Sequence, residues 1–300
     1  MIEGQYMCVI RRIMLVLMLP FPLLLGCNKG PSNAEFHTLK AEMYLRAGES
    51  EKAQQELDKV FSEDPDLIDG LLLQSRLFTL NNEIDKSIDV LVKAENVDYK
   101  NLDVLYSLGF VYSQKGDYSK AIETYRKAIE VKPDTALGYN NIAVVYHSKK
   151  DYQNAVKNYK KAIELNEKFI EAHYNLGNTY SMKGELENAI KHYNKAVEIK
   201  PEYTDPYIEL SAVYNKLGNK SEAGNNVGLY YFWRKQYDQA IKAFNDVIAT
   251  NPEYAVAYNN LAVCYDKIGN SEQSVINIKK SAKLGYAPAI EICKKNNISF

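Results

Sequence analysis

One pattern of residues returns every 34 positions along most of this chain. Leu108-Gly109, Tyr112, Gly116-Asp117 and Ala121 follow one another in the segment 102–135, and the same arrangement restarts at Ala136. It also restarts at Ile170, Ile68 and Ala34. Within each unit, positions 4, 7, 8 and 11 fall on one face of a helix. Units this short bury their apolar faces only against neighbouring copies, so the pattern predicts an all-α stack of repeats.

Three positions of the unit carry the pattern. Position 8 is small, which lets the first helix of a unit pack closely on the second: Ala41, Ser75, Gly109, Ala143, Gly177, Ser211, Gly228 and Ala262. Position 20 is small and is expected to face it: Ala53, Ser87, Ala121, Ala155, Ala189, Ala240 and Ser274. Position 11 is aromatic: Tyr44, Phe78, Tyr112, Tyr146, Tyr180, Tyr214, Tyr231 and Tyr265.

This spacing resembles the tetratricopeptide repeat, a helix–turn–helix unit. The resemblance covers residues 34–288 and implies an all-α, right-handed superhelical solenoid. We expect five full units and a half unit over 34–220, two further units over 221–288, and a capping helix over 289–300. Proline at position 32 should end the second helix of several units (Pro65, Pro133, Pro201 and Pro252). In the cap, Ile290 and Ile292 are expected to cover the last repeat.

The period breaks once. After the unit that begins at Thr204, the next unit begins at Ser221, half a repeat on. The segment 221–234 therefore fits both the second helix of one unit and the first helix of the next. Because Gly224 and Gly228 disfavour helix, we predict an irregularity between Leu217 and Gly228 that divides the stack and exposes Phe232, Trp233 and Arg234. The alternative is that packing absorbs the misfit and Trp233 is buried.

The first residues resemble a bacterial lipoprotein signal peptide. Arg11 and Arg12 precede an apolar run from Ile13 to Leu25, which is too short to cross a bilayer as a helix. The run ends in Leu24-Leu25-Gly26-Cys27, which resembles a lipobox. That resemblance implies a signal peptide over 1–27, acylation (palmitate) of Cys27, and a linker over 28–33. It also implies a cell-envelope location, with Asn28 favouring the outer membrane facing the periplasm; an uncleaved anchor is the alternative.

Composition and motifs give no support for catalysis. The 37 basic and 38 acidic residues leave a net charge of −1, which argues against a nucleic-acid partner. No phosphate-binding loop, metal-ligand spacing or nucleophile motif is present. We therefore expect no enzyme activity, no cofactor, no metal and no small-molecule substrate. Cys264 and Cys293 could pair in an exported protein, although free cysteine commonly packs as a small buried hydrophobe.

The resemblance also implies where a partner binds. In the family, positions 2, 5, 9, 12 and 13 of the first helices face a concave groove, which here gives Tyr106, Phe110, Asn140, Tyr174, Asn178, Asn225, Phe232, Trp233 and Asn259. Aromatic side chains anchor interfaces, and asparagine can bond a peptide backbone. We expect Tyr174 and Asn178, one turn apart, to serve binding and not stability. For the recurring asparagines at position 6 we favour a role in the repeat itself over a role in binding: Asn141, Asn175, Asn226 and Asn260.

Charge narrows the class of partner. Position 2 is mostly acidic (Glu35, Asp69, Asp103, Glu171, Asp205 and Glu222), and position 5 lacks the lysine of family members that bind acidic chaperone tails. Such a groove should repel carboxylate termini and accept basic or neutral peptides. The sequence thus predicts a lipid-anchored scaffold for protein or peptide partners in cell-envelope assembly, of the pilus, secretion or polysaccharide-export type. A periplasmic chaperone and a regulatory adaptor for a cell-wall enzyme are the alternatives.

Overall fold

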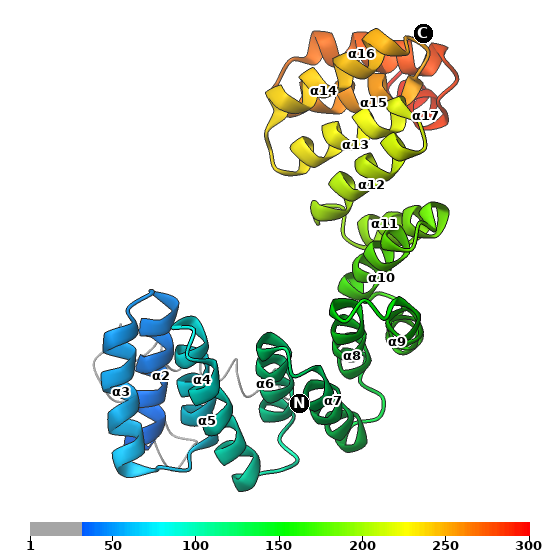
Figure 1. The fold of residues 1–300 in the computed structure, drawn as a ribbon. Helices are drawn as coiled ribbons and strands as arrows, with labels where there is room; N and C mark the ends of the chain where they lie inside the picture. Colours follow the sequence, from blue (N-terminus) through cyan, green and yellow to red (C-terminus); the bar gives the residue numbers. More distant parts are fainter. Residues whose placement is uncertain (1–31) are drawn as a thin grey trace, which may run out of the picture. The chain divides into compact units, whose positions relative to one another are not determined.

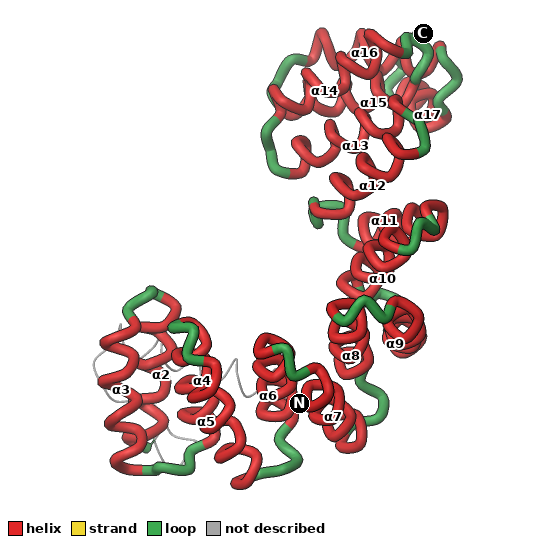
Figure 2. The backbone as a smooth tube through the Cα atoms, viewed as in Figure 1, coloured by secondary structure: helices red, strands yellow, loops and turns green. Residues whose placement is uncertain are grey.

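The computed structural model describes residues 32–300, and all of the regular secondary structure in that range is helical (Figures 1 and 2). Two compact units divide within helix α4, one ending at Leu77 and the other starting at Phe78. The predicted signal peptide over 1–27 and the predicted acylation of Cys27 lie outside the described residues. Within residues 32–300, no helix is both long enough and apolar enough to cross a membrane.

The first unit contains α2 (Asn33–Arg46), α3 (Ser50–Glu63) and most of α4 (Ile68–Leu80). Ser32 caps α2 in a reciprocal box: its hydroxyl accepts from the Glu35 backbone, and the Glu35 carboxylate accepts from the Ser32 N–H. Ala41 and Ala53, the small residues at positions 8 and 20, are fully buried in the core with Leu57.

The second unit repeats the helix–turn–helix plan. Its complete helices are α5 (Ile84–Val97), α6 (Leu102–Lys115), α7 (Tyr118–Val131), α8 (Ala136–Ser148), α9 (Tyr152–Leu165), α10 (Ile170–Met182), α11 (Leu186–Ile199), α12 (Asp205–Lys216), α13 (Lys220–Trp233), α14 (Tyr237–Thr250), α15 (Ala255–Lys267), α16 (Ser271–Lys283) and α17 (Ala287–Lys295). Gly116 and Gly184 turn the chain between paired helices with positive φ. Lys150 takes the same left-handed conformation in the turn between α8 and α9.

The small residue at position 8 has a more specific role than the sequence indicated. A β-carbon at Gly109 would lie 2.5 Å from the Tyr125 ring, and one at Gly177 would lie 2.6 Å from the Tyr193 ring. Tyr125 and Tyr193 stand at position 24 of the same units. The alanines at position 20 are buried as expected, but the residue that requires glycine at position 8 is the aromatic at position 24.

Helix α13 fills two places in the stack. It packs on α12 as a second helix and on α14 as a first helix, and α12 to α15 follow one another without interruption (Figure 1). The predicted irregularity between Leu217 and Gly228 is wrong. The α12–α13 connection is an ordinary turn with Gly218 at φ 77°, and α13 is one continuous helix. The glycines fit because Gly224 meets Val247 and Gly228 meets Phe244, which lets α14 approach closely.

The C-terminal helix α17 (Ala287–Lys295) packs on α16, whereas the sequence predicted a cap over 289–300 that uses Ile290 and Ile292. Ala289 and Cys293, one turn apart, are fully buried against α15 and α16 residues, whereas Ile292 is exposed. Ile290 packs at the edge of this cluster. Cys264 and Cys293 are both free and buried, and burial raises the pKa of the Cys264 thiol to about 12. Both cysteines therefore serve as packing residues.

Candidate partner-binding face

The first helices of four successive units form a row in which α6 contacts α8, α8 contacts α10, and α10 contacts α12. We call their exposed side the first-helix face. Helix α8 contains no Asp, Glu, Lys or Arg, and α10 contains only Glu171. Lys115 and Lys216 stand at the C-terminal ends of α6 and α12. Between its helix ends this face is therefore almost free of basic charge.

Exposed apolar side chains mark the first-helix face. Phe110 on α6 is 51% exposed, and Leu137 and Val144 on α8 are exposed two turns apart. Ile208 on α12 adds a fourth. Of these, only Phe110 was selected from the sequence. Leu137, Val144 and Ile208 stand at positions 2, 9 and 5, which are among the positions expected to face the groove. They were missed from the sequence because aromatic and amide side chains were chosen at those positions. Such residues suit the apolar part of an interface.

The expectation that Tyr174 and Asn178 serve binding alone needs correction for Asn178. The hydroxyl of the fully buried Tyr193 donates to Asn178 Oδ1 at 2.7 Å. Removing that acceptor would leave a buried hydroxyl without its partner, which costs about 1–3 kcal/mol. Asn178 therefore supports the packing of α10 on α11. Tyr174 is half-buried and keeps part of its ring exposed.

Two further predicted residues on this row differ in accessibility. Tyr106 is half-buried and its hydroxyl lies 3.2 Å from Thr135 Oγ1. Burial raises the pKa of the Tyr106 phenol. Asn140 is 6% exposed, and its Oδ1 accepts no hydrogen bond from any of residues 32–300. Its Nδ2 donates a long hydrogen bond to Asn141 Oδ1 at 3.4 Å. A buried amide with an unpaired acceptor reduces stability.

The remaining four predicted residues lie on α13 and α15. Asn225 is buried and accepts from Asn260 Nδ2 at 2.8 Å, so it links these two helices. Asn259, like Asn140, has a buried Oδ1 that no described residue pairs. Both asparagines are therefore in part packing residues between helices, in addition to any role on the surface.

Phe232 and Trp233 are half-buried, so the prediction that they are unusually exposed is wrong, although Arg234 is exposed. The Phe232 ring packs edge-on against Trp233 and Tyr237. The double packing of α13 holds these rings in place.

The histidines do not assemble a reactive centre among the described residues. His173 and His192 approach each other at 3.1 Å between their Nδ1 atoms, and His192 stacks on Tyr180. Burial lowers the pKa of both imidazoles, that of His192 to about 4. Across residues 32–300, no three His, Cys, Asp or Glu side chains gather as metal ligands. The pair is a packed, neutral contact between α10 and α11.

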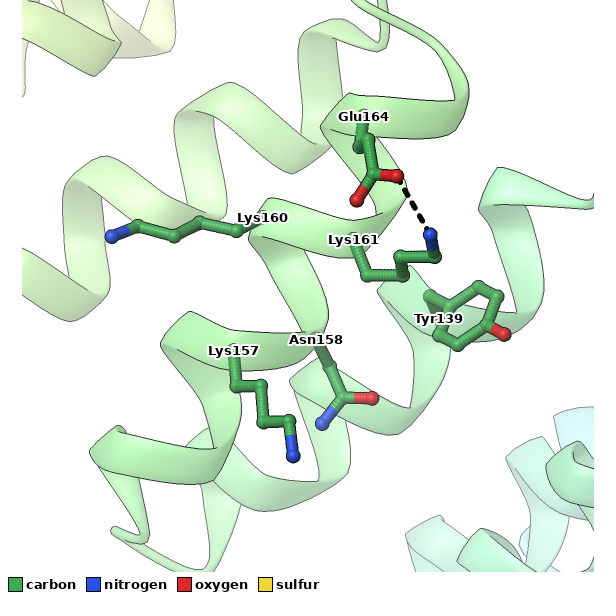
Figure 3. Close-up of a pocket in the computed structure, with 6 residues that line it drawn as sticks. All are labelled: Tyr139, Lys157, Asn158, Lys160, Lys161 and Glu164. Carbon is green, nitrogen blue, oxygen red and sulfur yellow. Dashed lines mark hydrogen bonds and ion pairs between the residues drawn. The ribbon is translucent and has the colours of Figure 1, made fainter.

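A shallow hollow of about 360 Å³ lies where α9 meets Tyr139 of α8 (Figure 3). It is lined by Tyr139, Lys157, Asn158, Lys160, Lys161 and Glu164. Lys161 pairs with Glu164 at 2.8 Å, while the side chain of Lys160 points away from Tyr139 (Figure 3). Lys157 and Lys160 are exposed, and none of the six lining residues is buried. It lacks the convergent groups that a small-molecule site requires.

Comparison with known families agrees with the repeat pattern. Family models described as TPR repeat or tetratricopeptide repeat match residues 111–150, 145–184, 170–203, 226–254 and 243–275. The chain therefore contains tetratricopeptide repeats. No curated protein sequence matches it.

Several solved structures share the fold. A structure from a functional characterization of Pseudomonas aeruginosa PilF has a TM-score of 0.57 and 18% identity, covering 66% of this chain and 90% of that one. PilW, a widely conserved type IV pilus biogenesis factor, has a TM-score of 0.58 and 16% identity, covering 78% and 99%. A tetratricopeptide repeat protein from Parabacteroides merdae has a TM-score of 0.50 and 16% identity, covering 87% and 98%. At these identities the likeness concerns the fold.

Proposed function

We propose that this repeat protein is a lipid-anchored scaffold that binds a protein or peptide partner on its first-helix face during cell-envelope assembly. The observation that carries the proposal is the surface of α6, α8, α10 and α12, where exposed apolar side chains lie on helices almost free of basic charge. A stack of repeats presents such a row as an extended surface, which suits a segment of polypeptide. Binding, and not catalysis, is the role this surface supports.

Two further points support the envelope setting. The Leu-Leu-Gly-Cys junction at residues 24–27 resembles a lipobox, and lipid on Cys27 would hold the repeats at a membrane. PilW, which has a similar fold, is described as a type IV pilus biogenesis factor. We extend that setting to this chain as part of the proposal, with the outer membrane facing the periplasm as the location.

Site-specific cross-linking tests the binding face. A photo-reactive amino acid at Phe110 of the full-length protein, expressed in its native cell, should capture one or a few proteins. The double variant Leu137→Ser/Val144→Ser should bind the partner more weakly, by about 1–3 kcal/mol of binding free energy, which is the usual effect of truncating interface residues. Less partner should therefore be captured. Ile276 on α16 is also exposed, so a cross-linker there and Ile276→Ser provide the matched controls. Equal capture from both positions would contradict the proposal, and capture of many unrelated unfolded proteins would favour a chaperone.

Metabolic labelling tests the anchor independently. With radioactive palmitate, the wild-type protein should be labelled and its precursor cleaved, and Cys27→Ser should abolish both. Cys8→Ser is the matched control, because Cys8 precedes the apolar run and lies outside the lipobox-like junction. Labelling that survives Cys27→Ser would refute the lipid anchor while leaving the binding face untouched.

A further inference from the structure

Two tyrosines of the unit 170–203 meet on the first-helix face. The Tyr174 ring on α10 lies 5.4 Å from the Tyr203 ring, which precedes α12, and the two planes cross at 76°. Both side chains are half-buried, so part of each ring stays exposed to solvent. The fully buried Tyr193 supports Tyr174 from behind, with ring centroids 6.1 Å apart. The pair is therefore a fixed aromatic surface.

Three carboxylates stand near this pair in the chain. Glu171 lies one turn before Tyr174 on α10, and Asp205 and Glu209 lie one turn apart at the start of α12. Burial is the main cause that raises the pKa of both phenols. Glu209 and Asp205 raise that of Tyr174 further, and Asp205 and Glu171 raise that of Tyr203. The carboxylates thus lie within electrostatic reach of the rings.

The three carboxylates have no ion-pair partner within the described part of the chain, although Lys168 and Lys200 stand in the turns before α10 and α12. Glu171, Asp205 and Glu209 form no ion pair among residues 32–300, whereas Glu164 and Glu198 on the second helices are paired with Lys161 and Lys195. Helix α10 has no lysine or arginine, and the one lysine of α12 is Lys216 at its far end. An aromatic surface with uncompensated carboxylates attracts a cation.

We propose that Tyr174 and Tyr203, with Glu171, Asp205 and Glu209, bind a lysine or arginine side chain of the partner polypeptide. This inference rests on the proposed function and specifies its partner as one with a basic residue in the bound segment. The cation stacks on the tyrosine rings while the carboxylates supply its counter-charge. The exposed Leu137, Val144 and Ile208 on the adjacent helices accept apolar residues that flank the cation.

A pair of peptides that differ only in charge tests the site. The full-length protein, purified in detergent with isotope-labelled tyrosine, is titrated with acetyl-Gly-Arg-Gly-amide and followed by NMR. The ring signals of Tyr174 and Tyr203 should shift saturably. The citrulline peptide, which replaces the guanidinium with a neutral urea, should bind about tenfold more weakly or not at all.

Variants complete the test. The combined change Glu171→Gln, Asp205→Asn and Glu209→Gln should weaken arginine-peptide binding by about tenfold or more. The combination Glu123→Gln, Glu130→Gln and Glu187→Gln removes the same charge from exposed positions on second helices and should leave binding unchanged. Equal binding of the two peptides, equal binding by the first variant, or no saturable shift of the two rings would overturn the cation site.

The two proposals fail in different ways. If cross-linking at Phe110 captures a partner equally in the wild type and in the Glu171/Asp205/Glu209 variant, the binding face stands and the cation site is refuted. If no partner is captured from Phe110 but the arginine peptide still binds at Tyr174 and Tyr203, the cation site stands and the scaffold function is refuted.

Discussion

The ring of Phe244 on α14 lies directly against Gly228 of α13, so closely that no β-carbon fits at that position. Glycine costs a helix about 1 kcal/mol relative to alanine, so its place inside α13 follows from packing. One turn earlier, Gly224 faces Val247 in the same way. These contacts explain how one helix pairs with α14 while it also packs on α12.

Gly228→Ala should therefore destabilise the protein in spite of its better helix propensity. We expect the free energy of unfolding to fall by about 1–3 kcal/mol, because the added methyl group forces the Phe244 ring to move in a packed core. Urea unfolding followed by circular dichroism measures the change. Asn215→Ala, at an exposed position of α12, is the control and should stay within about 0.5 kcal/mol of wild type. A stabilising effect of Gly228→Ala would show that the contact is looser than described.

Limited proteolysis checks the continuity of α12, α13 and α14. Since α13 packs on both neighbours, trypsin should cut after Lys216 or Lys220 no faster than after Lys183, which lies in an equivalent turn. The rates are compared from the first fragments by mass spectrometry. Early cleavage after Lys216 or Lys220 that leaves two resistant fragments would instead support a hinge between α12 and α13.

The sequence predicted the repeats because each unit solves the same packing problem with the same spacing. It predicted that position 8 must be small, but not that the ring at position 24 is the reason, as for Gly109 and Tyr125. Periodicity identifies a buried face without identifying the residue that packs on it. The half-repeat offset was read correctly as one helix with two roles. The predicted irregularity was wrong because packing against Val247 and Phe244 overrides the low helix propensity of Gly224 and Gly228.

The residues of the candidate site were harder to predict than the fold, because the position of a residue in the repeat does not determine whether its side chain is exposed. Asn140 and Asn225 occupy position 5 and are buried, whereas Ile208 occupies the same position and is exposed. Asn225 is buried because α13 lies beside α15. Its side chain accepts a hydrogen bond from Asn260 on α15. Likewise, Tyr203 belongs to no first helix, so the position rule could not select it. Tyr203 contacts Tyr174 because the turn before α12 brings its ring to α10.

Asn140 is expected to reduce the stability of the free protein. Because its buried Oδ1 accepts no hydrogen bond, Asn140→Leu should raise the free energy of unfolding by about 1 kcal/mol. Asn226 provides a matched comparison: it is also 6% exposed, but its Nδ2 donates to the Glu222 carbonyl at 2.8 Å. Asn226→Leu should therefore not stabilise. Thermal unfolding of both variants measures the difference, and equal effects would mean that the unpaired acceptor has no energetic role.

The burial of His173 and His192 against each other should make stability depend on pH. Burial lowers the pKa of both imidazoles in the folded protein, and that of His192 falls to about 4 with the His173 imidazole and the ammonium groups of Lys191 and Lys160 as further causes. An unfolded histidine has a pKa of about 6.5. As the pH falls below that value the unfolded state takes up protons first, so the contribution is fully present above about pH 6.5 and is lost toward pH 4.

We expect the free energy of unfolding to fall by about 2 kcal/mol between pH 7.5 and pH 5 on account of His192. His192→Gln keeps an amide that can bond His173 Nδ1 but removes the titrating group, so its unfolding should vary less over this range. The measurement is urea unfolding at half-unit steps of pH, and the variant's slope is compared with that of His147→Gln. His147 is a fair control because burial also lowers its pKa, yet it bonds Thr179 and no second histidine. If the slope of His192→Gln equals that of wild type, the imidazole pair is not the source of the pH dependence.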